Sequence, residues 1–246
     1  MPKLADLNSM EQYTSGHYGF SGVRIENLGA TEYTLVSIAV DCSGSVSGFQ
    51  AEMEKAVQSI VESCYKSPRA DNLMIRLTTF NSQLSENHGF KLLSDCNKDD
   101  YKGALNAWGS TALFDASENA VSSVTLYGKS LMKNDFNVNA IIVVVTDGCD
   151  NVSKYTANSV KESLKKAVSD ETLESLVSIL IGVNIQDTEV SRALDFFHKE
   201  AGFTQYVEVG NADSKTLAKL ADFVSKSISS QSQSLGTGGP SKPLTF

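Results

Sequence analysis

The chain has 246 residues, of which 41% are hydrophobic and 20% charged, and its formal net charge is −8. This length suits one large α/β domain, and two small domains are also compatible with it. The acidic excess argues against a surface that binds nucleic acid or an anionic membrane, because neither partner would be attracted to it.

No segment approaches the roughly 18 consecutive apolar residues that a transmembrane helix needs. The longest apolar run, Ala140–Val145, is short enough to be a buried strand, and the first residues carry no apolar run of signal-peptide length. The four cysteines, Cys42, Cys64, Cys96 and Cys149, are scattered and include no CxxC pair. We therefore expect reduced thiols and a cytoplasmic protein.

The first half of the domain predicts strands that alternate with helices. Thr34–Val40 is rich in β-branched residues and leads into the polar loop Asp41–Ser45, which is typical of a buried strand. From Phe49 to Cys64, apolar residues recur at spacings of three and four, which predicts an amphipathic helix. Strands are then expected at Leu73–Phe80 and, over a shorter length, at Phe90–Leu93.

The second half continues the alternation. A helix is expected from Ala112, directly after Gly109-Ser110-Thr111. Asn139–Thr146 is a nearly continuous apolar run, typical of a central parallel strand whose two faces are both buried. The remaining predicted elements are a helix at Ala157–Ser169, a strand at Leu176–Val183, a helix at Thr188–Glu200, a strand at Gln205–Val209 and a helix at Asp213–Ser229.

This order of elements predicts a doubly wound α/β fold, with a mostly parallel sheet and helices on both of its faces. We assign residues 33–229 to this domain. Residues 1–32 lack clear periodicity and are expected to form an arm or an edge strand. Residues 230–246 are dominated by Ser, Gln, Gly and Pro, which predicts a flexible tail.

Polar side chains follow two of the predicted strands and precede one helix. Asp41, Ser43 and Ser45 follow the first strand, Thr111 stands before the helix that starts at Ala112, and Asp147 follows the Asn139–Thr146 strand. Ligands bind at the carboxyl ends of the strands in an open parallel sheet, so we expect these five residues to lie close together.

This set contains only oxygen ligands, which Mg²⁺ prefers, and Mn²⁺ or Ca²⁺ could also occupy such a site. Two of the five side chains are anionic and three are neutral hydroxyls. A metal held in this way keeps positive charge and can accept a carboxylate from another molecule. The pattern therefore predicts a binding function.

The Asp-x-Ser-x-Ser motif at Asp41, Ser43 and Ser45, with Thr111 and Asp147 downstream, resembles the metal-ion-dependent adhesion site of von Willebrand factor A domains. The resemblance covers roughly residues 33–229. It implies that the serines and the threonine contact the metal, that the aspartates act through water, and that a partner protein's Asp or Glu completes the shell. It also suggests a stand-alone bacterial or phage type, with a MoxR-type AAA+ ATPase as one partner, and no enzymatic activity.

Three other functions fit part of the pattern. A phosphatase or phosphotransferase could use Asp41 as its nucleophile, but such enzymes usually carry a second aspartate where this chain has Ser43. A metal-assisted hydrolase would need a general base near the metal, but the three loops hold no His, Glu or Lys. A secreted or virion adhesin could share the same metal site in another compartment.

Several nearby residues have simpler interpretations. Asp41 or Ser43 could cap the helix that follows. We expect Asp115 and Asp150 to be solvated, and Cys42 and Cys149 to be small buried residues. Trp108 could equally form a wall of the partner surface or part of the core.

Overall fold

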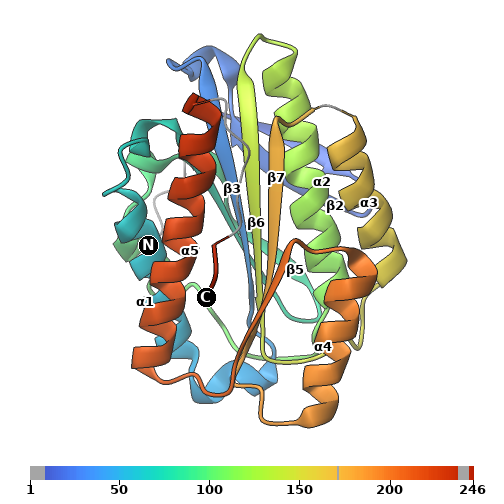
Figure 1. Cartoon of the computed structure of the whole chain (residues 1–246). Helices are drawn as coiled ribbons and strands as arrows, with labels where there is room; N and C mark the ends of the chain where they lie inside the picture. The colour runs from blue at the N-terminus through green and yellow to red at the C-terminus, as the bar shows by residue number, and fades with distance from the viewer. Residues whose placement is uncertain (1–8, 171, 238–243) are drawn as a thin grey trace.

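The computed structural model describes residues 9–170, 172–237 and 244–246. Within them, one eight-stranded sheet with the order β1-β2-β5-β4-β3-β6-β7-β8 forms the middle layer (Figure 1). The strands are β1 (Met10–Ser15), β2 (Tyr18–Val23), β3 (Glu32–Asp41), β4 (Leu73–Phe80), β5 (Leu84–Leu92), β6 (Asn137–Thr146), β7 (Ser175–Val183) and β8 (Gln205–Val209).

Helices cover both faces of the sheet, which confirms the predicted doubly wound α/β class. On one face, α1 (Gln50–Cys64) and α5 (Ser214–Thr237) enclose a core with alternate residues of β3 and β6. On the other face, α2 (Leu113–Met132), α3 (Ala157–Ser169) and α4 (Thr188–Ala201) enclose a second core. Among the helices described, none combines the length and apolar character that crossing a bilayer requires.

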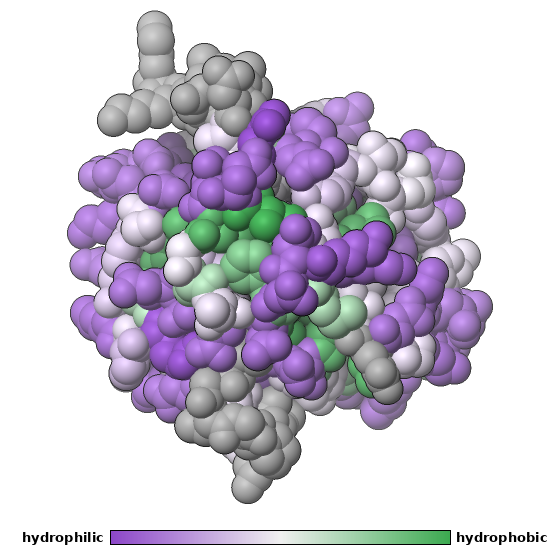
Figure 2. All heavy atoms as spheres, turned by 90° about the horizontal axis from the view of Figure 1, so that it is seen from above, coloured by the Kyte–Doolittle hydropathy of each residue, from purple (hydrophilic) through white to green (hydrophobic). Residues whose placement is uncertain are grey.

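The two central strands bring distant loops together. β3 pairs in parallel with β6 from Glu32↔Asn137 to Val40↔Val145, so the two strands end side by side. Parallel pairing also joins β3 to β4, β6 to β7 and β7 to β8, whereas β4–β5 and β1–β2 are antiparallel. Figure 2 shows the end of the molecule at which the parallel strands begin. Hydrophilic residues cover most of this end, and hydrophobic residues gather near its middle. The polar loops that follow the parallel strands lie at the other end of the molecule.

The N-terminal arm forms a hairpin at the sheet edge. β1 pairs with β2 along its whole length, and Gly22 of β2 pairs in parallel with Phe90 of β5. Residues 1–8 of the predicted arm lie outside the described residues.

The prediction that the last helix ends at Ser229 was wrong, because α5 continues to Thr237. Gln231 in this extension is buried and hydrogen-bonded: its amide donates to the carbonyl of Ala140 (3.1 Å) and to Ser175 Oγ (2.7 Å), and Asn139 donates to the Gln231 carbonyl (2.9 Å). These partners replace water, so the polar composition does not produce a tail here. Residues 238–243 of the predicted tail lie outside the described residues, and Leu244 packs against the core on the α5 side.

One half-buried histidine, His88, gives the fold a predicted pH dependence. His88 Nδ1 lies 2.9 Å from the carbonyl oxygen of Gly89, and Nε2 lies 2.9 Å from the Tyr101 hydroxyl. A neutral ring satisfies both contacts, with Nδ1–H donating and Nε2 accepting. Burial, together with the charge of Lys91, lowers the pKa of His88 to about 4.

Between pH 6.5 and pH 4 the unfolded chain therefore binds a proton at His88 that the folded chain does not. Stability should fall as the pH drops through this window, by up to about 1.4 kcal/mol per pH unit from this group. We expect His88→Gln to flatten this part of the profile, as measured by urea unfolding at pH 7.5, 6 and 5 with chelator present. Parallel profiles for the variant and the wild type would refute the assignment.

Candidate metal centre

Asp41 lies at the end of β3 and is fully buried, with 0% exposure. Its Oδ1 accepts a hydrogen bond from the Ser43 amide (2.7 Å), and its Oδ2 accepts one from Thr146 Oγ1 (2.6 Å) at the end of β6. The carboxylate therefore joins the two central strands where they end.

The two serines extend this contact to Asp147. Ser43 Oγ lies 3.1 Å from Ser45 Oγ, and Ser45 Oγ donates to Asp147 Oδ1 (2.8 Å). Ser43 is buried, whereas Ser45 is exposed. The Ser43 end of this contact thus lies in the protein, and the Ser45 end faces solvent.

Backbone hydrogen bonds hold the third loop against the first. The Gly44 amide donates to the Gly109 carbonyl (3.0 Å), and the Trp108 amide donates to the Cys42 carbonyl (3.0 Å). Gly109 has φ +74°, and a Cβ there would lie 2.7 Å from Ser82 Oγ, so the loop requires glycine at this position. Thr111 follows two residues later and is 5% exposed. The structure therefore places all five predicted residues on three adjoining loops.

The site concentrates negative charge in a poorly solvated place. Burial raises the pKa of Asp41 to about 6, against the effect of its hydrogen bonds to Thr146 and Ser43, and the nearby charge of Asp147 acts in the same direction as burial. Burial likewise raises the pKa of Asp147. Neither residue belongs to an ion pair among the described side chains. Two such carboxylates favour a cation beside them.

The donor set fits a hard divalent ion. Hydrogen bonds link Asp41 to the Ser43 amide and join the side-chain oxygens of Ser43, Ser45 and Asp147, and two backbone hydrogen bonds hold the loop before Thr111 against the first loop. The described part of the chain contains no group of three or more His, Cys, Asp or Glu residues arranged for a metal. A metal at this site would thus depend on hydroxyl ligands as well as carboxylates.

The capping interpretation of the first loop was wrong. The residue before α1 is Phe49, and Ser43, which precedes the short 3₁₀ turn Gly44–Gly48, makes no side-chain capping bond. Asp150 does act at a helix start, because its Oδ1 accepts a hydrogen bond from the Phe114 amide (3.2 Å) in the first turn of α2.

The predicted exposure of the residues near the site is confirmed for some of them and wrong for others. Asp115 was expected to be solvated but is 2% exposed, because backbone amides and a tyrosine hydroxyl surround its carboxylate. Cys42 is buried as expected, whereas Cys149 is partly exposed. Trp108 is 51% exposed and therefore does not lie in the core.

Two residues that support the loops were not predicted from the sequence. Thr146 donates to Asp41, and Asn151 Oδ1 accepts from the Thr111 amide (2.8 Å). The position of Thr146, directly before Asp147 at the end of a strand, was a usable signal for the first. Asn151 had none, because its partner is 40 residues away in the chain.

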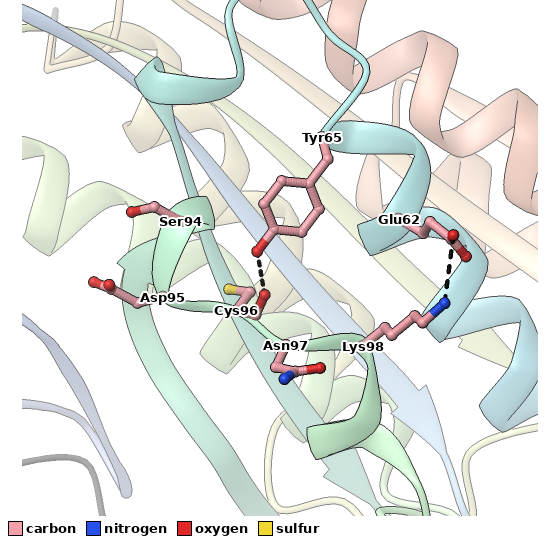
Figure 3. A pocket seen from close by; sticks show the side chains of 7 residues that line it. All are labelled: Glu62, Tyr65, Ser94, Asp95, Cys96, Asn97 and Lys98. Carbon is pink, nitrogen blue, oxygen red and sulfur yellow. Dashed lines mark hydrogen bonds and ion pairs between the residues drawn. The ribbon is translucent and has the colours of Figure 1, made fainter.

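A separate groove of about 380 Å³ lies where α1 ends (Figure 3). Its polar groups contact one another: the Tyr65 hydroxyl bonds to the Cys96 carbonyl, and Lys98 Nζ lies 3.4 Å from Glu62 Oε1. Ser94 and Asp95 point away from the Tyr65 ring. The groove therefore lacks the converging oxygen atoms found at the three loops of the candidate metal centre.

Solved structures of other proteins share the fold. Proximal thread matrix protein 1 from the mussel byssus aligns with a TM-score of 0.57 and 17% identity, over 81% of this chain and 47% of its own. The pilus adhesin SpaC from Lactobacillus rhamnosus GG gives 0.60 and 11%, over 90% and 33%. The PilB minor pilin from Streptococcus sanguinis gives 0.57 and 16%, over 89% and 66%. The chain thus spans less than two thirds of each of these proteins.

A form of the mussel protein has zinc in its MIDAS motif, and it aligns with a TM-score of 0.53 and 19% identity over 80% of this chain and 46% of its own. No curated protein matches the sequence. The family model for the von Willebrand factor type A domain matches residues 36–222, which include all three loops of the site. The chain therefore belongs to the von Willebrand factor type A domain family.

Proposed function

We propose that this domain binds a partner protein through a divalent metal ion, with Mg²⁺ as the resident ion, and that it has no enzymatic activity. Ser43, Ser45 and Thr111 would contribute hydroxyl oxygens, and Asp41 and Asp147 would contribute carboxylates. When bound, the ion supplies a Lewis-acidic position that accepts an aspartate or glutamate of the partner.

The observation that carries this proposal is the series of hydrogen bonds that joins buried Asp41 through Ser43 to exposed Ser45 and half-buried Asp147. Such a site holds the ion from within and leaves its outer side open. Family membership supports it, as does the zinc-containing MIDAS of the mussel protein. The exposed Trp108 ring, next to Gly109, adds an apolar surface beside the open side.

The protein is also proposed to work in the cytoplasm. Its four cysteines are free, and three of them are buried. Unpaired thiols are usual in a reducing compartment, which supports this part of the proposal.

A calorimetric titration of the metal-free protein with Mg²⁺ and Mn²⁺ tests the first step. Capture from a lysate, with and without chelator, tests the second, and proteins released by the chelator are then identified. We expect one site per chain and a chelator-sensitive partner whose binding is lost when one of its acidic residues is changed to the amide. A protein that binds neither ion at millimolar concentration would refute the proposal.

Thr111 offers a matched pair of variants. Thr111→Val keeps the shape but removes the hydroxyl, whereas Thr111→Ser keeps the hydroxyl. Because water can replace one neutral ligand, we expect Thr111→Val to weaken Mg²⁺ binding by about tenfold or less and to reduce partner capture more strongly. Thr111→Ser should retain both. If Thr111→Val captured the partner as well as the wild type does, Thr111 would not be a ligand in the bound state.

A further inference from the structure

The β1–β2 hairpin lies outside the residues that the family model matches, yet its turn lies against the loop that carries Asp147. Gly16 in the turn has φ +57°, and a Cβ there would lie 2.0 Å from Tyr155 Oη. Both the backbone conformation and the close approach therefore require glycine. The contact between the turn and Tyr155 therefore depends on the glycine at position 16.

Three further contacts join the hairpin to this region. The Tyr18 hydroxyl donates to Asp115 Oδ2, and the His17 amide donates to Tyr155 Oη (3.3 Å). Lys154 Nζ lies 5.7 Å from the centre of the Tyr18 ring, within the range of a cation–π contact. Tyr18 thus touches both α2 and the loop that follows β6.

Asp115 is the junction between these elements. It lies in the first turn of α2, four residues after Thr111, and is 2% exposed. Its Oδ1 accepts hydrogen bonds from the amides of Lys154 and Tyr155, both at 2.8 Å. A buried carboxylate needs such donors, and the Tyr18 hydroxyl completes the set on Oδ2.

The loop that follows β6 is also hydrogen-bonded to the start of α2 at positions nearer to the predicted metal ligands. The Thr111 amide donates to Asn151 Oδ1 (2.8 Å), and the Asn151 amide donates to the Thr111 carbonyl (3.0 Å). The Phe114 amide donates to Asp150. The loop is therefore held at residues 150–155, and its first part carries Asp147 beside Ser45.

We propose that the hairpin clamps the metal loop, by which we mean residues 147–155. Tyr18, acting through Asp115, fixes this loop and so holds Asp147 and Thr111 at the spacing that the ion requires. Tyr18 and Asp115 are positioning residues, since neither lies among the predicted ligands. This inference rests on the proposed function, because it assigns part of the metal affinity to an element outside the family match.

Tyr18→Phe tests the clamp, and Tyr13→Phe is its control. Both variants remove one hydroxyl from the same hairpin, but the Tyr13 hydroxyl contacts Glu11 (2.9 Å) and Ser130 (3.5 Å), away from the metal loop. In metal-free protein, we expect Tyr18→Phe to speed hydrogen exchange of the Lys154 and Tyr155 amides by about threefold or more. Titration with Mg²⁺ should give a Kd about tenfold weaker than that of the wild type, as is usual for residues that support ligands. Tyr13→Phe should change neither quantity.

A merely structural role for Tyr18 would lower the melting temperature and leave the Mg²⁺ affinity of the folded protein unchanged. That result, or unchanged exchange at Lys154 and Tyr155, would overturn the proposal. Asp115→Asn, which retains an oxygen acceptor, should reproduce the loss of affinity if Tyr18→Phe folds poorly. A wild-type protein that binds no divalent ion would instead refute the proposed function, so the two failures are distinguishable.

Discussion

Asp41→Asn is expected to lower Mg²⁺ affinity by at least about 100-fold and to abolish partner capture. The substitution removes one of the two anionic groups in the site, and ligand charge strongly sets affinity for hard cations. It changes few packing contacts, because asparagine has nearly the same shape. Thr146 Oγ1 can still donate to the Gly148 carbonyl (3.0 Å), so its hydroxyl keeps a partner when the carboxylate is gone.

The same substitution should have opposite effects on stability with and without metal. In metal-free protein at pH 7, Asp41 places a buried charge without a basic partner, and its removal should stabilise the fold by about 1–2 kcal/mol. At a Mg²⁺ concentration 100 times the Kd, the wild type gains about 2.7 kcal/mol from binding, and the variant gains almost nothing. The order of the two melting temperatures should therefore reverse between EDTA and Mg²⁺.

Asp71→Asn is the matched control, because Asp71 is exposed and precedes β4 at the other end of the sheet. It should behave as the wild type in both conditions. Undiminished Mg²⁺ affinity in Asp41→Asn would show that the site is assigned wrongly. Lower stability of Asp41→Asn in EDTA would show that Asp41 matters mainly as a hydrogen-bond acceptor for Ser43 and Thr146.

Apolar runs predicted the strands and helices well, because a strand that is buried on both faces appears in the sequence as a nearly continuous apolar run. The strands Leu73–Phe80 and Gln205–Val209 and the helix Ala157–Ser169 have the predicted bounds. The three loops of the site were also found from spacing alone, since each follows a buried strand or precedes a helix. The structure brings their residues together, and binding of a metal to them stays a prediction.

The features that were missed depend on polar side chains paired across long sequence separations. Asp115 looked solvated because its partner Tyr18 is 97 residues away, and Gln231 looked like part of a tail because its partner Ala140 is 91 residues away. Polarity predicts exposure only when no distant donor or acceptor takes the place of water. The arm or edge strand predicted for residues 1–32 is a two-stranded hairpin at the sheet edge, and its two strands were not predicted individually because each has only six residues.

Arg76 is the clearest case of such a pairing. It lies in the middle of β4, in a run that reads as apolar, and its side chain is 1% exposed. Its Nε donates to Glu86 Oε2 (2.7 Å) on β5, and its Nη2 donates to Asn119 Oδ1 (2.8 Å) on α2. Glu86 in turn accepts hydrogen bonds from the Ser21 amide (3.0 Å) and hydroxyl (2.6 Å) on β2. One guanidinium therefore links the central sheet, its outer strands and a helix.

We expect Arg76→Ala to destabilise the metal-free protein by about 3–5 kcal/mol in urea unfolding, because it opens a cavity and leaves buried polar groups without a partner. Arg76→Lys keeps the charge but cannot bond to Glu86 and Asn119 together, so its loss should be intermediate. Arg192→Ala is the control: Arg192 pairs with Glu189 at 2.8 Å, but both side chains are more than 70% exposed, and such pairs contribute about 0–1 kcal/mol. A loss below about 1 kcal/mol for Arg76→Ala would mean that water replaces the guanidinium. Because Glu86 joins Arg76 to Ser21, the hairpin also contacts the core at a point separate from Tyr18.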